Sequence, residues 1–146
     1  MRYELTIPGK PFGKEEKRVV RRGAYVSSYL PQHSRDYMND IKLLWNSKYP
    51  NHKLLTGPVN LHITAYMPIP KATSKKALLL MYTYDTYHTK RPDASNIIKL
   101  VEDGLTGCAW VDDSQVMPYC VKFYSDTPRV ELVIQPLDKS NGMETS

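Results

Sequence analysis

The amino-acid sequence predicts a single α+β domain with one mixed β-sheet and two main helices, in the order strand, helix, strand, helix, strand, strand. A chain of 146 residues has the length of one ordinary domain. Apolar residues recur with period two in some segments and at offsets of three and four in others. Helices packed against one sheet are the arrangement that this pattern favours. We expect residues 1–137 to form the domain and the polar residues 138–146 to form a flexible C-terminal tail.

The first half of the chain contains two expected strands and the first expected helix. Residues 3–7 alternate and end at Pro8-Gly9, which indicates a short strand and a turn. Ser34 is a suitable N-cap for a helix that Pro50 ends. Residues 59–67 then alternate as a strand, with His62 on its solvent side. The core positions predicted here are Tyr37, Ile41, Leu44 and Trp45 on the helix and Val59, Leu61, Ile63, Ala65 and Met67 on the strand.

A basic segment, KPFGKEEKRVVRRGAYV, separates the first strand from the first helix. Its glycines favour a loop or a loose hairpin, and only Glu15 and Glu16 offset its positive charge. The formal net charge of +5 favours a polyanionic partner without establishing one. The segment is therefore either a solvated loop or a strip that follows a phosphate backbone. The residues predicted to contact DNA are Lys10, Lys14, Lys17, Arg18, Arg21 and Arg22, with Lys90 and Arg91 later in the chain.

A long connection, residues 69–91, follows the second strand. It holds a possible short helix after Ser74 and a tyrosine-rich stretch. Tyr82, Tyr84 and Tyr87 would either stack on unpaired bases or pack within the protein, and the sequence leaves both open.

The second half contains the other helix and the last two strands. Asp93 is a suitable N-cap for a helix with Ile97, Ile98, Val101 and Leu105 on one face. Gly107 would stop this helix. Residues 115–124 and 129–135 are expected to pair as a hairpin through the turn at residues 125–128. Asn96, Lys99 and Asp103 form a polar stripe on the helix.

Carboxylates gather around this second helix. Asp112 and Asp113 are adjacent, and two such charges repel unless a cation or hydrogen-bond donors offset them. Together with Asp93 they would suit Mg²⁺, which prefers oxygen ligands. A turn that uses aspartate only for local hydrogen bonds is the other interpretation. If the metal site is real, phosphodiester hydrolysis follows, with Lys99 placed to stabilise negative charge.

Other classes of protein find less support in the sequence. Cys108 and Cys120 lack the spacing of a zinc site or a disulfide framework and are expected to be reduced and half-buried. The chain has neither the apolar start of a signal peptide nor a run of about 20 apolar residues. We therefore expect a soluble cytoplasmic protein that contacts no membrane.

The segment KRPDASNIIKLVEDGLTGCAWVDDSQV resembles the signature of the RusA-type Holliday junction resolvases, which are crossover junction endodeoxyribonucleases often carried by prophages. Weaker similarity extends to IPGKPFGKEEKR and YMPIPKATSKK. The resemblance implies that Asp93 and Asp113 are catalytic, metal-binding carboxylates and that Lys99 is the essential basic residue. Asn96, Asp103 and Asp112 would help to shape the site, with Asp112 as a further metal ligand. The family pattern often has a second aspartate where this chain has Ser95.

The resemblance also implies partners and a cofactor. It indicates a homodimer, encoded by a bacterium or a phage, that uses Mg²⁺, with Mn²⁺ able to substitute, to resolve four-way DNA junctions by paired symmetrical nicks. Recombination, repair or phage replication would use this activity. Ser95 motivates one alternative, a junction-binding protein with weak or no catalysis. A nuclease for other branched DNA is a further alternative.

Overall fold

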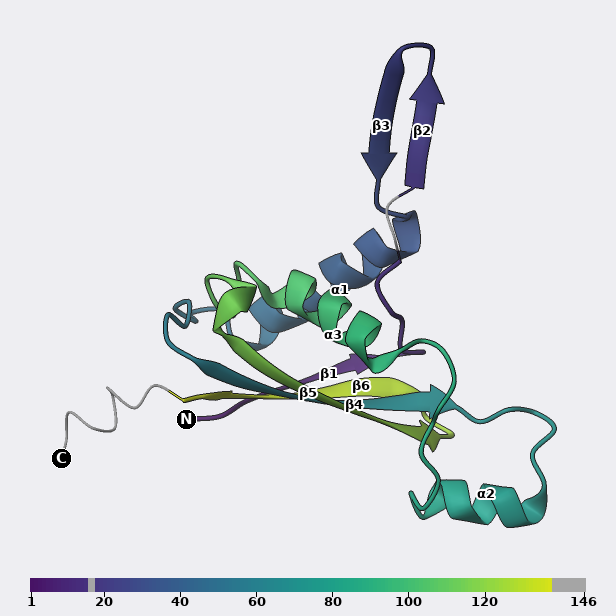
Figure 1. Ribbon diagram of the computed structural model, residues 1–146. Coiled ribbons are helices and arrows are strands. Elements are labelled where there is room, and N and C mark those ends of the chain that lie inside the picture. Colours follow the sequence, from purple (N-terminus) through teal and green to yellow (C-terminus); the bar gives the residue numbers. More distant parts are fainter. Residues whose placement is uncertain (16–17, 138–146) are drawn as a thin grey trace.

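The computed structural model describes residues 1–15 and 18–137, so the expected tail at 138–146 lies outside the described residues. A four-stranded sheet has the order β1-β6-β4-β5, made of β1 (Tyr3–Pro8), β4 (Val59–Pro68), β5 (Val116–Ser125) and β6 (Arg129–Pro136). Helices α1 (Gln32–Lys48) and α3 (Ala94–Leu105) both cover one face of this sheet (Figure 1). The predicted class, α+β with a mixed sheet, is confirmed. None of the described helices is long and apolar enough to cross a membrane.

The core lies between the sheet and these two helices. On β4 the expected alternation is confirmed, because all five predicted apolar positions are buried and His62 is exposed. Tyr37, Ile41 and Trp45 of α1 are buried as predicted, and Leu44 packs against them at the edge. A Cβ atom added to Gly104 would lie 2.9 Å from Ile41 Cδ1, so the close approach of α1 and α3 depends on this glycine.

The predicted hairpin between the last two strands is wrong. β5 pairs in parallel with β4, whereas β6 lies on the other side of β4 and runs antiparallel to both β4 and β1. A helix between two strands favours their parallel pairing, and α3 connects β4 to β5 in this way. Residues 126–128 then carry the chain past Pro68, where β4 ends, to its far side.

The start of α1 also differs from the prediction. Pro31, not Ser34, occupies the N-cap, and it offers no side-chain capping bond. Ser34 lies buried in the first turn instead. Because proline has its φ angle fixed near the helical range, it is well suited to the start of a helix, and this preference outweighs the capping preference of serine.

The basic segment forms an ordered hairpin that is separate from the main sheet. β2 (Arg18–Arg22) pairs with β3 (Tyr25–Tyr29), and the hairpin projects away from the helices (Figure 1). Gly23 and Ala24 connect the strands, and Gly23 has a φ of +60°. Glycine at the first central position is typical of a type II′ turn, whose twist suits a two-residue hairpin loop.

The long connection carries α2 (Lys75–Tyr82), which confirms the short helix expected after Ser74. The Ser74 hydroxyl accepts a hydrogen bond from the Ala77 N–H at 3.2 Å. Tyr84 and Tyr87 then pack on Phe123 of β5, each with a ring-centroid distance of 5.2 Å. One side of each of these two rings therefore contacts the protein, but both side chains remain exposed, Tyr84 at 43% and Tyr87 at 61%, as does Tyr82 at 50%. Both interpretations of the tyrosines thus stay open.

Candidate active site

Helix α3 and its N-cap carry most of the predicted site residues. Its buried face, which includes Ile97 and Leu100, packs on the core and fixes the helix in place. Ser95 and Lys99 are exposed, whereas Asn96 is half-buried. Because helix positions three and four apart are neighbours, Ser95 and Lys99 project from the same side of α3.

Asp93 occupies the N-cap of α3 but does not use its side chain to cap the helix. Its carbonyl oxygen accepts the N–H groups of Asn96 at 3.0 Å and Ile97 at 3.1 Å. Its backbone is extended, its side chain makes no capping hydrogen bond, and the residue is exposed. The N-cap position is confirmed, and capping by the side chain does not account for the carboxylate, which remains available for a ligand.

Lys122 fastens the segment that leads into Asp93. From β5, its ammonium donates hydrogen bonds to the carbonyl oxygens of Lys90 at 2.7 Å and Pro92 at 2.8 Å. The His88 N–H also donates to the Lys122 carbonyl at 2.9 Å. Residues 88–92 are thus tied to the sheet, and the backbone before Asp93 has a fixed position. Sequence reasoning missed Lys122, whose only signal is a charged residue on the helix-covered side of a strand.

A cleft of about 640 Å³ opens at the start of α3, where the chain after β1 crosses the helix. Gly13 makes this crossing possible, because a Cβ atom there would lie 2.9 Å from Pro92 Cβ and 3.0 Å from Asn96 Cβ. The Lys14 N–H donates to the Asn96 carbonyl at 2.9 Å, which holds the crossing segment on α3. The polar side chains that line the cleft include Lys10, Lys14, His33, Arg91, Asp93 and Asn96.

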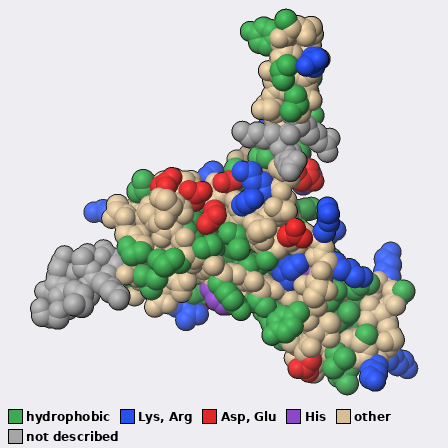
Figure 2. Space-filling model, in the orientation of Figure 1, with side chains coloured by type: hydrophobic (Ala, Val, Ile, Leu, Met, Phe, Trp, Pro, Cys, Tyr) green, Lys and Arg blue, Asp and Glu red, His purple; other side chains and the backbone are tan. Residues whose placement is uncertain are grey.

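The predicted DNA-contacting residues fall into two groups. Lys10, Lys14 and Arg91 come together in the cleft, with the exposed Lys90 next in sequence to Arg91. Arg21 and Arg22 lie on the hairpin, where both are exposed. Lys17 lies outside the described residues; Arg18 begins β2, but its side chain is not described. Figure 2 shows acidic and basic side chains interspersed on the helix-covered side below the hairpin.

Asp112 and Asp113 begin the turn that leads into β5, and they have different surroundings. The Asp112 carboxylate accepts the Ser114 N–H at 3.1 Å and caps a short 3-10 helix, Asp113–Gln115. Hydrogen bonds from Ser114 hold the pKa of Asp112 below its ordinary value. Gln115 closes the turn, because its Oε1 accepts the Asp112 N–H at 2.8 Å. Asp112 therefore has a structural role here, which agrees with the local-turn interpretation, while the exposed Asp113 carboxylate makes no hydrogen bond with the described residues.

Glu102 is the acidic residue that sequence reasoning missed. It lies half-buried on α3, seven residues after Ser95 and three after Lys99, so its side chain projects on their side of the helix. Burial, followed by the charges of Asp113 and Asp103, raises its pKa to about 7. Its spacing from Lys99 is the signal that could have identified it. Glu102 therefore connects Asp113 electrostatically to α3.

Asp103 takes part in an ion pair instead of standing free. Its carboxylate oxygen lies 2.6 Å from Lys14 Nζ. The pair joins the crossing segment to the last turn of α3, beyond the contact made by the Lys14 N–H. Asp103 therefore contacts a residue that lines the cleft, and its role in shaping the site stays a prediction.

The structure does not gather Asp93 and Asp113 into one group with a third acidic side chain. Within residues 1–15 and 18–137, no group of three or more histidine, cysteine, aspartate or glutamate residues is placed to hold a metal ion. Glu102, the neighbour of Asp113, comes nine residues after Asp93, which is about 13 Å along a helix axis. The metal-binding roles of Asp93, Asp112 and Asp113 thus stay predictions, as does the role of Lys99.

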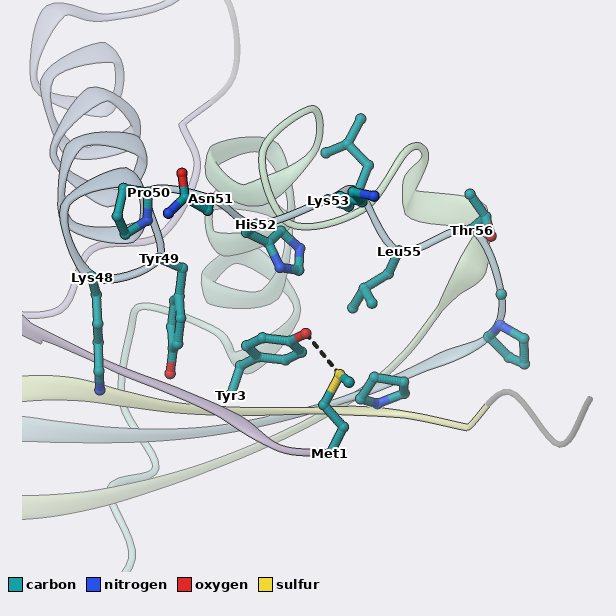
Figure 3. A pocket seen from close by; sticks show the side chains of 14 residues that line it. Met1, Tyr3, Lys48, Tyr49, Pro50, Asn51, His52, Lys53, Leu55 and Thr56 are labelled. Carbon is teal, nitrogen blue, oxygen red and sulfur yellow. Dashed lines mark hydrogen bonds between the residues drawn. The ribbon is translucent and has the colours of Figure 1, made fainter. Parts of the chain in front are cut away.

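Another pocket, of about 580 Å³, lies away from these residues, beside the start of β1 and the loop after α1 (Figure 3). Its wall includes the aromatic rings of Tyr3, Tyr49 and His52, and the Tyr3 hydroxyl donates to Met1 Sδ at 2.8 Å. None of its lining residues is acidic. The residue types suited to phosphodiester chemistry therefore lie around α3 and not in this pocket.

A comparison with protein-family models identifies the family. Residues 8–135 match the family model described as Endodeoxyribonuclease RusA. The chain is also 33% identical, over 135 residues, to the uncharacterized protein YqaN of Bacillus subtilis (strain 168), an alignment that covers 90% of this chain and 94% of that protein. The family match includes the cleft, all of α3 and the turn with Asp112 and Asp113. The chain therefore belongs to the RusA endodeoxyribonuclease family.

Proposed function

We propose that the protein is a Mg²⁺-dependent, structure-selective endodeoxyribonuclease that resolves four-way DNA junctions by paired symmetrical nicks. The observation that carries the proposal is the cleft at the start of α3, in a chain of the RusA family. The lining of this cleft combines the Asp93 carboxylate, which makes no capping hydrogen bond to α3, with three basic side chains, those of Lys10, Lys14 and Arg91. Positive side chains attract a phosphate backbone, whereas a carboxylate repels it. A cation bound between the carboxylate and the phosphate would offset this repulsion.

The residues near α3 fit a hard divalent cation. The carboxylates around Asp113 offer oxygen ligands, and Glu102 adds a half-buried carboxylate whose pKa is raised first by burial and then by the charges of Asp113 and Asp103. Mg²⁺ keeps several waters and takes further ligands from substrate phosphates, so it needs only one or two protein carboxylates. Asp113, with Asp112 and Glu102 nearby, would supply ligands at one end of α3, and Asp93 would supply a ligand at the other end. When bound, the cation would lower the pKa of a water and stabilise charge on the phosphate.

The side chains of the protein would position the DNA. Lys10 and Arg91 would bind phosphates in the cleft, while Lys14 is kept at its edge by Asp103. Lys122 fixes the backbone before Asp93, which keeps that carboxylate at the cleft. Lys99, exposed between Ser95 and Glu102, would stabilise negative charge as the phosphodiester bond breaks.

A homodimer suits this substrate. A four-way junction has approximate two-fold symmetry, and an isologous dimer presents two equivalent sites to its two opposed strands. Each protomer would make one nick, and the two nicks together would resolve the junction.

The central test is Asp113→Asn. We expect this variant to lose cleavage of a four-way junction, by at least about 1,000-fold, because the amide removes a ligand charge in the reaction site. Junction affinity without divalent cations should be unchanged or stronger, since repulsion of the DNA falls. Single-turnover cleavage, gel-shift titration and binding of Mn²⁺ monitored by electron paramagnetic resonance would measure these effects. Normal cleavage by the variant would refute the role of Asp113.

A second candidate function is junction binding with weak or no catalysis, which Ser95 favours. Ser95 is exposed at the start of α3, and a hydroxyl there brings no negative charge for a cation. Binding of junctions by the parent chain without paired nicks, together with a gain of cleavage in Ser95→Asp, would support this function. Efficient nicking by the parent chain would exclude it. Flap and linear duplex substrates, compared at one salt concentration, would identify a nuclease for other branched DNA.

A further inference from the structure

The β2–β3 hairpin, here called the arm, is residues 18–29 and has no partner strand in the main sheet. All five side chains of β3 are exposed, including those of Tyr25 and Tyr29. Val19 and Val26 are exposed as well. A two-stranded hairpin is marginally stable in water by itself, and large apolar side chains gain nothing from remaining solvated. The arm therefore has the features of a surface that receives a partner.

The two faces of the arm differ. Because side chains alternate along a strand, Tyr25, Ser27 and Tyr29 share one face with Val20 and Arg22. These five residues line a hollow of about 630 Å³. Tyr25 pairs directly with Arg22 across the strands, and it is 79% exposed. Its ring therefore lies open to solvent beside a guanidinium group. The opposite face carries Val19, Arg21, Val26 and Ser28.

The charge of the arm selects the class of partner. Residues 18–29 contain three arginines and no acidic residue. In Figure 2 the arm shows hydrophobic and basic side chains but no acidic side chain on the visible face. A second copy of this arm would bring like charges together, which disfavours an arm-to-arm contact. A polyanion with flat apolar groups complements both the arginines and the tyrosine rings.

The arm also rises from the rim of the cleft. Glu15 precedes the arm in the chain and His33 follows it, and both line the cleft. His33 Nε2 lies 2.7 Å from Glu15 Oε1. Phe12, another cleft residue, has its ring centroid 5.5 Å from that of His33. A DNA strand whose phosphates lay in the cleft would therefore pass the base of the arm.

We propose that the arm enters the open centre of branched DNA and that Tyr25 and Tyr29 stack on base faces left unstacked there. This inference rests on the proposed function and adds the feature that would distinguish a branch from a linear duplex. An intact duplex has its bases stacked on one another and offers no free faces, whereas the strand-exchange point of a junction can expose them. Arg22, beside Tyr25, would contact a neighbouring phosphate. Phosphate contacts in the cleft would be common to both kinds of DNA.

The test compares variants that change only the rings. Tyr25→Leu and Tyr29→Leu keep apolar bulk but remove the aromatic face, while Tyr25→Phe keeps it. With a four-way junction in EDTA, we expect each leucine variant to lose about tenfold in affinity, and Tyr25→Phe to bind like the parent. Affinity for linear duplex should stay the same in all variants. Val26→Ala, on the opposite face of the arm, is the matched control.

A fluorescent base gives a second readout. 2-Aminopurine placed at the strand-exchange point should be quenched when the parent protein stacks on it, and the quenching should be lost in the leucine variants. Leucine variants that match the parent in junction affinity and quenching would overturn the role of the arm. Loss of dimerisation in those variants would overturn it too, because a second copy would then be the partner. A parent protein that shows no preference for junctions over duplex would instead refute the proposed function itself.

Discussion

At the scale of single residues, Glu102 has the most unusual environment of the acidic side chains around α3. Its pKa lies at about 7 because the carboxylate is half-buried and faces the charges of Asp113 and Asp103. The folded protein thus holds the Glu102 proton more tightly than the unfolded chain does. Folding takes up a proton between the ordinary value of 4.5 and about 7, so the free energy of unfolding due to this group falls as the pH rises through that window.

Glu102→Gln should remove this pH dependence. We expect the Tm of the variant to exceed that of the parent by a few degrees at about pH 8 and to match it at about pH 4, since at low pH the parent carboxyl is neutral too. Excess Mg²⁺ at the higher pH should raise the Tm of the parent more than that of the variant. Thermal unfolding followed by circular dichroism measures both effects. If the Tm of the parent and the Tm of the variant changed with pH in the same way, the ionisation of Glu102 would not be linked to folding.

The sequence predicted many of the residues around the cleft, but not their relations. The sequence identifies the start of α3 through Pro92 and the N-cap preference of Asp93, and Arg91 and Asn96 lie next to this start. Glu102 and Lys122 did not stand out, since the signals they carry, a spacing of three from Lys99 and a charge on the helix-covered side of a strand, are weak ones. Their importance comes from neighbours that are distant in sequence, such as Asp113 for Glu102 and the Pro92 carbonyl for Lys122.

At the scale of elements, two glycines set how closely segments approach α3. Gly104 lets α1 pack on one part of the helix, and Gly13 lets the segment after β1 cross its start. Gly104 lies in the core between two helices, whereas Gly13 lies at the cleft and leads directly to Lys14. The same substitution should therefore have separate consequences at the two positions.

Gly104→Ala should lower the free energy of unfolding by about 1–3 kcal/mol, because the added methyl group overpacks against Ile41. Gly13→Ala should also lower stability, because Pro92 Cβ and Asn96 Cβ cannot rotate away, and it should weaken junction binding by about tenfold, because the segment with Lys14 must move off α3. Urea unfolding and fluorescence anisotropy with labelled junctions would measure the two quantities. Gly13→Ala binding as tightly as the parent would mean that this segment does not position DNA.

Most elements were predictable from their periodicity. The apolar faces of α1, α3 and β4 follow the 3.6-residue and two-residue repeats closely, because each element buries one side against the same core. The partner of each strand was not predictable in this way. Alternation shows which side of β6 is buried, but it carries no information about whether β5 or β4 lies beside it.

At the scale of the whole molecule, the prediction is that two protomers act on one junction. We expect the protein to sediment as a dimer at micromolar concentration. Mixed dimers with one Asp113→Asn protomer should nick a plasmid-borne cruciform once and give open circles, whereas the parent should give linear product. This follows because two nicks on opposed strands need two intact sites. A monomer that resolves junctions fully would contradict the dimer.

The overall class was predictable because one chain of this length with alternating strands and two amphipathic helices has few ways to build a core. The direction of the arm was not predictable, since residues 18–29 bury no apolar face in the core of the main sheet that would fix how the arm is placed. Asp93 and Asp113 illustrate the same limit, because their relation depends on how α3 and the turn before β5 are placed.

The position of β6 has a consequence for how the chain is made. β1 and β6 are the first and last strands of the described sheet along the chain, yet β6 lies between β1 and β4 and is the sole pairing partner of β1 within that sheet. β1 therefore has no partner strand until residues 129–136 have been synthesised. Such non-local pairing slows folding, since the chain loses the entropy of loop closure before the stabilising contacts between the two strands form. Biosynthesis of the C-terminal strand is thus the event that allows the sheet to close.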